Sequence, residues 1–299
     1  MKEISYPNKT FMPTLPRHEP FFQDHSATII LKNCPRKYFY RIVLGRESTY
    51  QPYQVVLEFG SAYHKFREIL ELKSYKAAME YVMSVELHIP QTGNKFEYLN
   101  KLRLLKTCQM AFEHWQKEKN DKRIEVIAVE QPFNVSISDD VFISGRADQI
   151  VRWNGRLWGR DFKTTSKDQS QFSKGIDPND QAIRYITGES LLHGQQVQGI
   201  IFEAMYNTKT VGPKIFTVLS SRVKYQLDQW MKEQKLINRI LQIYRAEDTW
   251  PMHEHNCSWC NYNKVCKLTS EQAMEATLKS DYVLRPWDHN AVEQKTIEE

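Results

Sequence analysis

The sequence lacks several features that would place a protein in a class at once. It has no run of about eighteen or more uncharged apolar residues, which excludes a membrane-spanning helix of ordinary length. Its start, MKEISYPNKT, lacks the basic-then-apolar build of a signal peptide, so we expect a protein of the cytosol without membrane contact. Repeats of fixed period and low-complexity tracts are absent. The motif G-x-x-x-x-G-K-[ST] is also absent, so any ATP-driven motor activity must come from a partner.

Cysteine is scarce, whereas apolar and aromatic residues are plentiful. Five cysteines in a chain without an export signal argue against a disulfide framework and for free thiols or metal ligands. With 299 residues, 41% of them apolar, and 7 Trp, 14 Phe and 15 Tyr, the chain can build a sizeable core. The formal net charge of +5 suits a polyanionic partner, although 41 basic against 36 acidic residues is a modest excess.

Hydrophobic periodicity changes from helical to strand-like and back along the chain, which predicts an α/β fold with a central mixed sheet. Turn residues such as Asn154-Gly155 separate three β-rich segments, which predict a meander. Asp177 and Pro178 form a helix-start signature, and Gly194 ends that helix. The expected helices cover about 60–72, a segment after it, 96–115, 178–194 and 221–244, and the expected strands cover 123–138, 141–151, 155–165, 197–207 and 214–220.

The segment GRDFKTT places Asp161 and Lys163 on one face of an expected strand, because side chains alternate across a strand. A hairpin through Asn154-Gly155 would bring Asp148 of the preceding strand opposite Asp161. Two such carboxylates repel unless a cation lies between them, and hard oxygen ligands suit Mg²⁺ or Mn²⁺. The ion and the lysine together would suit phosphodiester hydrolysis. The alternative is a surface salt bridge worth about 0–1 kcal/mol.

These residues belong to an ordered set through which the sequence resembles the PD-(D/E)XK nucleases, particularly the RecB-like exonuclease branch. The resemblance implies a restriction-endonuclease-like core, with a central mixed β-sheet flanked by helices. The matching pieces are GSAYH with His64, GRAD with Asp148, DFK with Asp161 and Lys163, QAIRY with Gln181 and Tyr185, and a scattered cysteine set.

The resemblance also implies a role for each matching residue. His64, Asp148, Asp161 and the Phe162 carbonyl would bind Mg²⁺ or Mn²⁺, and Lys163 would be catalytic. A lone histidine such as His64 is more often partly buried and satisfied by a hydrogen bond, and its place in the ordered set favours the ligand role instead.

Three further residues are weaker candidates at the same site. Gln181 and Tyr185 lie four apart and so emerge on one side of their helix, where the resemblance implies that they hold DNA and orient the active site. An ordinary polar helix face is the alternative. Glu130 matches an acidic position sometimes found near such sites.

Three late cysteines form a C-x2-C-x5-C set, and a fourth lies far upstream. The AddB and CRISPR-associated exonucleases of this branch bind a [4Fe-4S] cluster through one early and three late cysteines. The resemblance therefore implies such a cluster here. A structural Zn²⁺ site that includes His253 or His255 is the alternative. Cys108 lies on the apolar side of an expected helix and is interpreted as a small core residue. The implied cluster ligands are Cys34, Cys257, Cys260 and Cys266.

We therefore expect a metal-dependent DNA exonuclease that acts on single-stranded or free DNA ends in recombination, repair or CRISPR adaptation. A helicase or another protein of those pathways would be its partner, in a bacterial cytoplasm or, for a phage protein, that of the host. The alternatives are a non-catalytic DNA-end-binding scaffold and an RNA-directed nuclease on the same fold. The expected divisions are an N-terminal extension (1–30), a nuclease domain (31–268) with a helical insertion at about 75–120 and a metal-cluster region formed by Cys34 and 257–266, and a tail (269–299).

Overall fold

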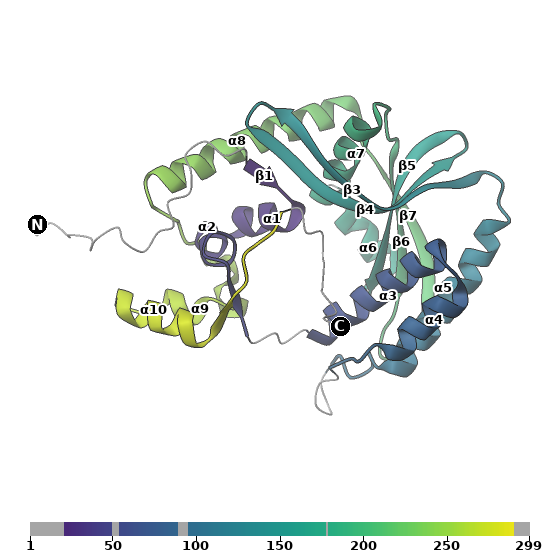
Figure 1. Cartoon of the computed structure of the whole chain (residues 1–299), viewed down its shortest axis with the longest axis horizontal. Helices are drawn as coiled ribbons and strands as arrows, with labels where there is room; N and C mark the ends of the chain where they lie inside the picture. The colour runs from purple at the N-terminus through teal and green to yellow at the C-terminus, as the bar shows by residue number, and fades with distance from the viewer. Residues whose placement is uncertain (1–20, 50–53, 89–94, 178, 290–299) are drawn as a thin grey trace, which may run out of the picture.

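A six-stranded mixed sheet forms the centre of the computed structural model, which describes residues 21–49, 54–88, 95–177 and 179–289. The strand order is β1-β4-β5-β6-β7, and β3 pairs with the other edge of β4 (Figure 1). The predicted α/β fold with a central mixed sheet is thus confirmed. The strands are β1 Phe21–Gln23, β3 Ile124–Ser138, β4 Val141–Trp153, β5 Arg156–Thr165, β6 Gly199–Tyr206 and β7 Lys214–Ser221.

The predicted meander corresponds to β3, β4 and β5. The tight turn between β4 and β5 requires positive φ at two central residues, and Asn154 and Gly155 provide it with φ values of 49° and 77°. This turn pairs β4 and β5 in antiparallel register, with Trp153 opposite Arg156. The next strand, β6, runs parallel to β5, which requires a long crossover connection.

Helices cover both faces of the sheet, and each layer has its own core. Phe59, Phe66 and Leu104 pack with Phe162 on one face, whereas Phe133 packs with other buried side chains on the opposite face. No helix within the described part of the chain is both long and apolar enough to cross a membrane. The helices around the sheet are α3 Gln54–Leu72, α4 Tyr75–Ser84, α5 Lys101–Lys119, α6 Gln169–Ile176, α7 Asp180–His193 and α8 Lys224–Ala246.

Helix boundaries differ from the predicted ones where capping decides them. The helix expected from 96 begins at Lys101, because the Asn100 side chain accepts a hydrogen bond from the Arg103 backbone N–H. In α7 the cap is Asn179, and Gly194 ends the helix in the left-handed region as predicted. Pro178 of the predicted start signature lies outside the described residues.

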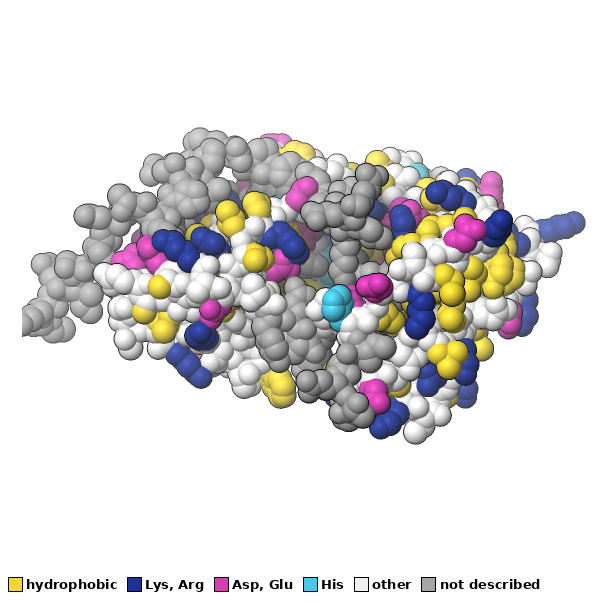
Figure 2. Space-filling view, turned by 60° about the horizontal axis from the view of Figure 1, so that its bottom comes forward, with side chains coloured by type: hydrophobic (Ala, Val, Ile, Leu, Met, Phe, Trp, Pro, Cys, Tyr) yellow, Lys and Arg dark blue, Asp and Glu magenta, His cyan; other side chains and the backbone are white. Residues whose placement is uncertain are grey.

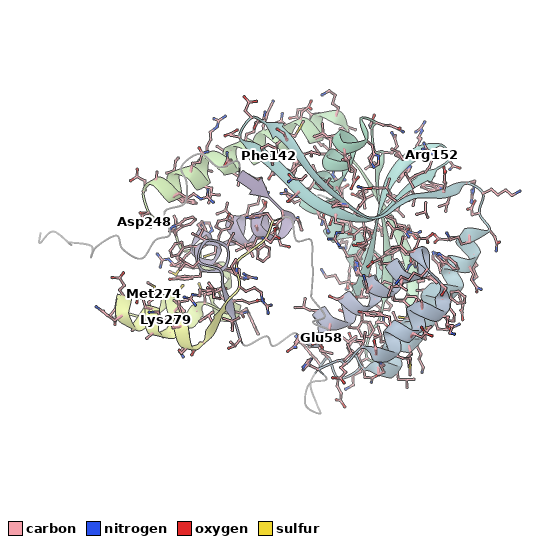
Figure 3. The ribbon with its side chains drawn as sticks, in the orientation of Figure 1. Glu58, Phe142, Arg152, Asp248, Met274 and Lys279 are labelled. Carbon is pink, nitrogen blue, oxygen red and sulfur yellow. The ribbon has the colours of Figure 1, made fainter. Side chains whose placement is uncertain are left out.

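Segments from both ends of the chain form a second lobe beside the sheet (Figure 1). Strands β2 and β8 pair antiparallel, and Tyr40, Tyr262 and Tyr282 stack at centroid separations of 5.5 and 5.1 Å. Met274 and Lys279 mark the late helix of this lobe in Figure 3. The segments are α1 His25–Asn33, α2 Pro35–Tyr38, η1 Phe39–Val43, β2 Arg46–Ser48, η2 Glu254–Trp259, α9 Asn263–Cys266, α10 Glu271–Ser280 and β8 Tyr282–Leu284.

Ordered structure therefore lies within both terminal segments that the sequence left without predicted elements. Strand β1 joins the central sheet in parallel with β4, and α10 and β8 belong to the second lobe. The division of the chain at residues 30 and 268 stays a prediction.

We expect Gly188→Ala to lower the free energy of unfolding by about 1–3 kcal/mol, because overpacking forces core side chains to shift. An added Cβ at Gly188 would lie 2.3 Å from the Phe133 ring. Gly175→Ala is the matched control, since Gly175 is also helical and a Cβ there meets nothing within 4 Å. Urea denaturation of both variants measures the difference. Equal stability of the two would contradict the close approach of α7 to β3.

Candidate active site

Asp161 and Lys163 lie on one face of β5, as strand alternation predicts. Lys163 Nζ is 2.7 Å from Asp161 Oδ2, and the Asp161 side chain is only 2% exposed. Burial raises the pKa of Asp161, although the Lys163 ammonium opposes that change. Burial thus outweighs the Lys163 ammonium, which by itself favours the ionised form of Asp161.

A second carboxylate, Asp148, is held by groups from two neighbouring elements. His64 on α3 places Nδ1 at 3.2 Å from Asp148 Oδ2, and the Phe162 backbone N–H donates to the same oxygen at 2.6 Å. Burial opposes the charged imidazole, but the Asp148 carboxylate outweighs it, so the pKa of His64 is raised. Burial likewise opposes the charge on Asp148, yet His64 and Lys163 hold its pKa below the usual value. The structure thus brings α3, β4 and β5 together at one site.

The first turn of α7 approaches the same site. Gln181 Nε2 donates to Asp161 Oδ1 at 3.3 Å and to the Tyr185 hydroxyl at 3.0 Å. The turn itself is fixed, because Asp180 pairs with His25 and Lys32 of α1 at 3.2 and 3.0 Å. Gln181 thus contacts Asp161 directly, and Tyr185 contacts Gln181.

Glu130 lies on β3, in the backbone region opposite Asp148, with a left-handed φ of 50°. Burial and the nearby Asp148 carboxylate raise the pKa of Glu130 to about 7. Arg146 Nη1 donates to Glu130 Oε2 at 3.2 Å. Glu130 is thus within the electrostatic field of the site and is paired with Arg146.

The opposite face of β5 carries a buried ion network that sequence reasoning missed. Arg67 of α3 donates to Glu203 Oε1 at 2.5 Å, and Arg160 of β5 donates to the other oxygen of Glu203. Arg160 also donates to Glu118 of α5 at 2.6 Å. The available signal was a single acid inside the apolar strand GIIFEAMY, since a fully buried acid requires a partner.

His114, Glu118 and Glu203 place ligand-type atoms within 4.8 Å of one another, the one such group within the described residues. A divalent cation there would meet two guanidinium groups that already bind Glu203. We therefore assign these residues to the ion network. The same guanidinium groups contact the Phe162 ring, with Arg67 Cζ 4.0 Å and Arg160 Cζ 5.2 Å from the ring centroid. The network thus fixes the residue between Asp161 and Lys163.

The four predicted cluster ligands gather in the second lobe. Burial raises the pKa of Cys266, and the thiols of Cys260, Cys34 and Cys257 add to that rise, which places all four within electrostatic reach. Two contacts join the early and late segments beside them, from the Arg36 N–H to the Pro251 carbonyl at 3.0 Å and between His253 Nδ1 and the Asn33 carbonyl at 3.1 Å. Cys108 is fully buried in α5, as predicted.

The spacing of these thiols differs from that of a closed zinc site. Tetrahedral zinc with Zn–S distances of about 2.3 Å holds its sulfur ligands about 3.8 Å apart. Among the described residues, no three of the four thiol sulfurs lie within 4.8 Å of one another. A cubane cluster spreads its thiolates more widely, because each binds a different iron.

Comparisons with known proteins identify a family and a fold. The model of the PD-(D/E)XK nuclease superfamily matches residues 25–267. A solved structure described as "Putative exonuclease" from Eubacterium rectale aligns with a TM-score of 0.51 at 11% identity, over 86% of this chain and 92% of that chain. SSO0001 aligns at 12% identity over 82% of this chain and 98% of its own, with a TM-score of 0.28, which is too low to carry an argument. No curated protein matches the sequence.

We expect His114→Gln to reduce stability more at pH 6 than at pH 10. Hydrogen bonds to Glu118 and Glu203 raise the pKa of His114 to about 9. A raised pKa in the folded state means that this stabilisation is complete below the unfolded value of about 6.5 and disappears as the pH rises through about 9. Urea denaturation of the parent and the variant across this range measures the difference. A difference that does not change with pH would contradict the proposed pairing.

Proposed function

This chain belongs to the PD-(D/E)XK nuclease superfamily, and from that premise we propose that it is a Mg²⁺- or Mn²⁺-dependent DNA exonuclease. The observation that carries the proposal is the convergence of His64, Asp148, Asp161 and Lys163. A lone D-x-K pair is consistent with an ordinary salt bridge. Four matching residues from three separate elements in one site favour catalysis over that explanation.

The donor set fits a hard divalent cation. One imidazole and two carboxylates supply nitrogen and oxygen ligands, and the Phe162 carbonyl is the further ligand that the family pattern implies. Both carboxylates are largely buried, with side-chain exposures of 14% for Asp148 and 2% for Asp161. Their mutual repulsion and burial make a bound cation favourable. When bound, the ion would supply Lewis-acid polarisation of a phosphoryl oxygen and would lower the pKa of water.

The protein's own groups have separate tasks in the proposed hydrolysis. The Lys163 ammonium can donate a hydrogen bond to the negative charge that develops on the scissile phosphate, since its side chain is 30% exposed beside the buried Asp161. Gln181 holds Asp161 in orientation through one amide N–H and is itself held by Tyr185. The Phe162 N–H holds Asp148 in the same way.

Free DNA ends, single-stranded ones above all, are the substrate that we propose. The name of the Eubacterium rectale neighbour and the formal net charge of +5 both support this choice. Recombination, repair and CRISPR adaptation are pathways that need such trimming, and a helicase would be a fitting partner. The corresponding location is the cytoplasm of a bacterium, or of the host for a phage protein.

We further propose that Cys34, Cys257, Cys260 and Cys266 bind a [4Fe-4S] cluster with a structural role. The proximity of the four thiols supports this proposal. Ligation would join segments more than 200 residues apart and would make folding of this lobe depend on the metal.

We expect Lys163→Ala to lower kcat for Mg²⁺-dependent hydrolysis of end-labelled single-stranded DNA on the order of 10²-fold or more, because it removes a charge donor from the transition state. Lys167→Ala is the matched control, since Lys167 is exposed and lies just beyond β5. Gel analysis of products with Mg²⁺ and with Mn²⁺ measures the rates. Equal activity of Lys163→Ala and the parent would remove the assignment. Cleavage of a matched RNA but not of the DNA would show that RNA, not DNA, is the substrate.

We expect the protein isolated without oxygen to contain iron and sulfide, and Cys34→Ser to lose most of both and to melt at a lower temperature. Cys108→Ala is the control, because the buried Cys108 thiol lies apart from the four-cysteine group. Metal analysis and thermal denaturation provide the measurements. A colourless protein with bound zinc would refute the cluster.

A further inference from the structure

The second lobe contains a cavity of about 600 Å³ beside the cysteine-rich loop. Its walls come from the end of β2, from η2 and α9, and from the junction of α10 with β8. Among the described residues, the catalytic groups lie outside this wall. Cys260 in the wall is one of the proposed cluster ligands, and the functions proposed above assign no role to the other wall residues.

Trp259 lines this cavity and is 80% exposed, which is unusual for the largest apolar side chain. It lies in the turn between two of the predicted metal ligands. The Cys260 N–H donates to the Cys257 carbonyl at 3.2 Å, and Asn263 Nδ2 donates to the same carbonyl at 2.6 Å. These two hydrogen bonds stabilise the turn that carries Trp259.

Apart from Trp259, most residues of the cavity wall carry polar groups, and several of these groups form hydrogen bonds. Tyr282 is buried at its base, where its hydroxyl donates to the Asn261 carbonyl at 2.5 Å. Lys264 Nζ donates to Asp281 Oδ2 at 2.5 Å, and the Thr49 hydroxyl donates to the Asp281 carbonyl at 3.0 Å. An exposed aromatic face beside hydroxyl and amide groups matches a nucleobase, which stacks through its face and forms hydrogen bonds through its edge.

Lys264, the cation that lines the cavity, is paired with Asp281, so binding in the cavity would depend on stacking and hydrogen bonds rather than on free positive charge. A protein partner would favour a broad apolar surface, and on the face shown in Figure 2 hydrophobic side chains gather mainly on the right-hand half, whereas the second lobe lies at the left of the molecule (Figure 1).

The cavity also lies within reach of the catalytic site. Thr49 in its wall is five residues before Gln54, and extended chain covers at most about 18 Å over that interval. His64 lies ten residues farther along α3, about 15 Å at the helical rise. A separation of at most about 33 Å falls within the span of the roughly 4–16 nucleotides that single-strand grooves hold.

We propose that Trp259 and the adjacent cavity form a base-stacking subsite for single-stranded DNA outside the catalytic centre. This inference rests on the proposed nuclease function. The subsite would hold the strand a few nucleotides from the bond that is cut. It therefore contributes to binding of longer strands and not to the chemical step.

The test is the affinity of the full-length protein for a fluorescein-labelled 20-nucleotide oligo(dT), measured by anisotropy in EDTA so that no cleavage occurs. We expect Trp259→Ala to weaken binding by about 5- to 150-fold, the factor for one lost stacked base. Trp259→Phe should retain most of the affinity. Tyr225→Ala is the matched control, because Tyr225 is an aromatic residue with 69% exposure on α8, outside the cavity.

A second variant guards against damage to the cysteine loop. Ser280→Tyr places a larger side chain in the cavity wall, and we expect it to weaken binding while the bound iron and the melting temperature stay at parental values. Parental affinity in both Trp259→Ala and Ser280→Tyr would overturn the subsite and favour a protein-docking role for the indole. A parent that neither binds nor cleaves DNA would instead overturn the nuclease function itself.

Discussion

Charge buried on both faces of β5 is the constraint on which the rest of the structure depends. Asp161 and Lys163 occupy one face, and Arg160 occupies the other with Glu203 of β6. Buried charges are tolerated only when partners surround them, so the position of β5 depends on the neighbouring elements that supply those partners. Arg67 supplies one such partner from α3, the helix that also carries His64. The ion pairs of Arg67 and Arg160 with Glu203 on one face of β5 thus help to position the candidate active site on the other face.

The first turn of α7 extends this dependence to the second lobe. Although burial opposes its charge, contacts with His25, Arg184 and Lys32 hold the pKa of Asp180 well below its usual range. Gln181, the next residue, contacts Asp161, while Lys32 precedes Cys34 by only two residues. The segment that carries Cys34 is therefore tied to the helix whose Gln181 contacts Asp161. We infer that disorder around the four thiols would also disturb the position of Asp161, because α1 connects the two regions.

The second lobe shows how two distant parts of a chain can be joined without a disulfide. Strands β2 and β8 pair directly, and Tyr40, Tyr262 and Tyr282 stack between the early and late segments. The entropic cost of closing so long a loop grows only slowly with its length. Strand pairing, tyrosine stacking and the proposed metal ligation all hold the same two segments together. Each therefore offsets part of the entropic cost of closing the loop between them.

The sequence by itself determined the local features: alternation on β5, the Asn154-Gly155 turn, the helix carrying His64, and the order of the motifs. Each of these depends on residues close together in the chain, so periodicity and turn chemistry specify them. Only the tertiary structure decided that β1 joins the sheet, that both chain ends share a lobe, and that Glu203 binds two guanidinium groups. Those features depend on contacts between segments that are far apart in the sequence. Hydrophobic periodicity and turn residues do not specify which buried charged side chain pairs with which partner.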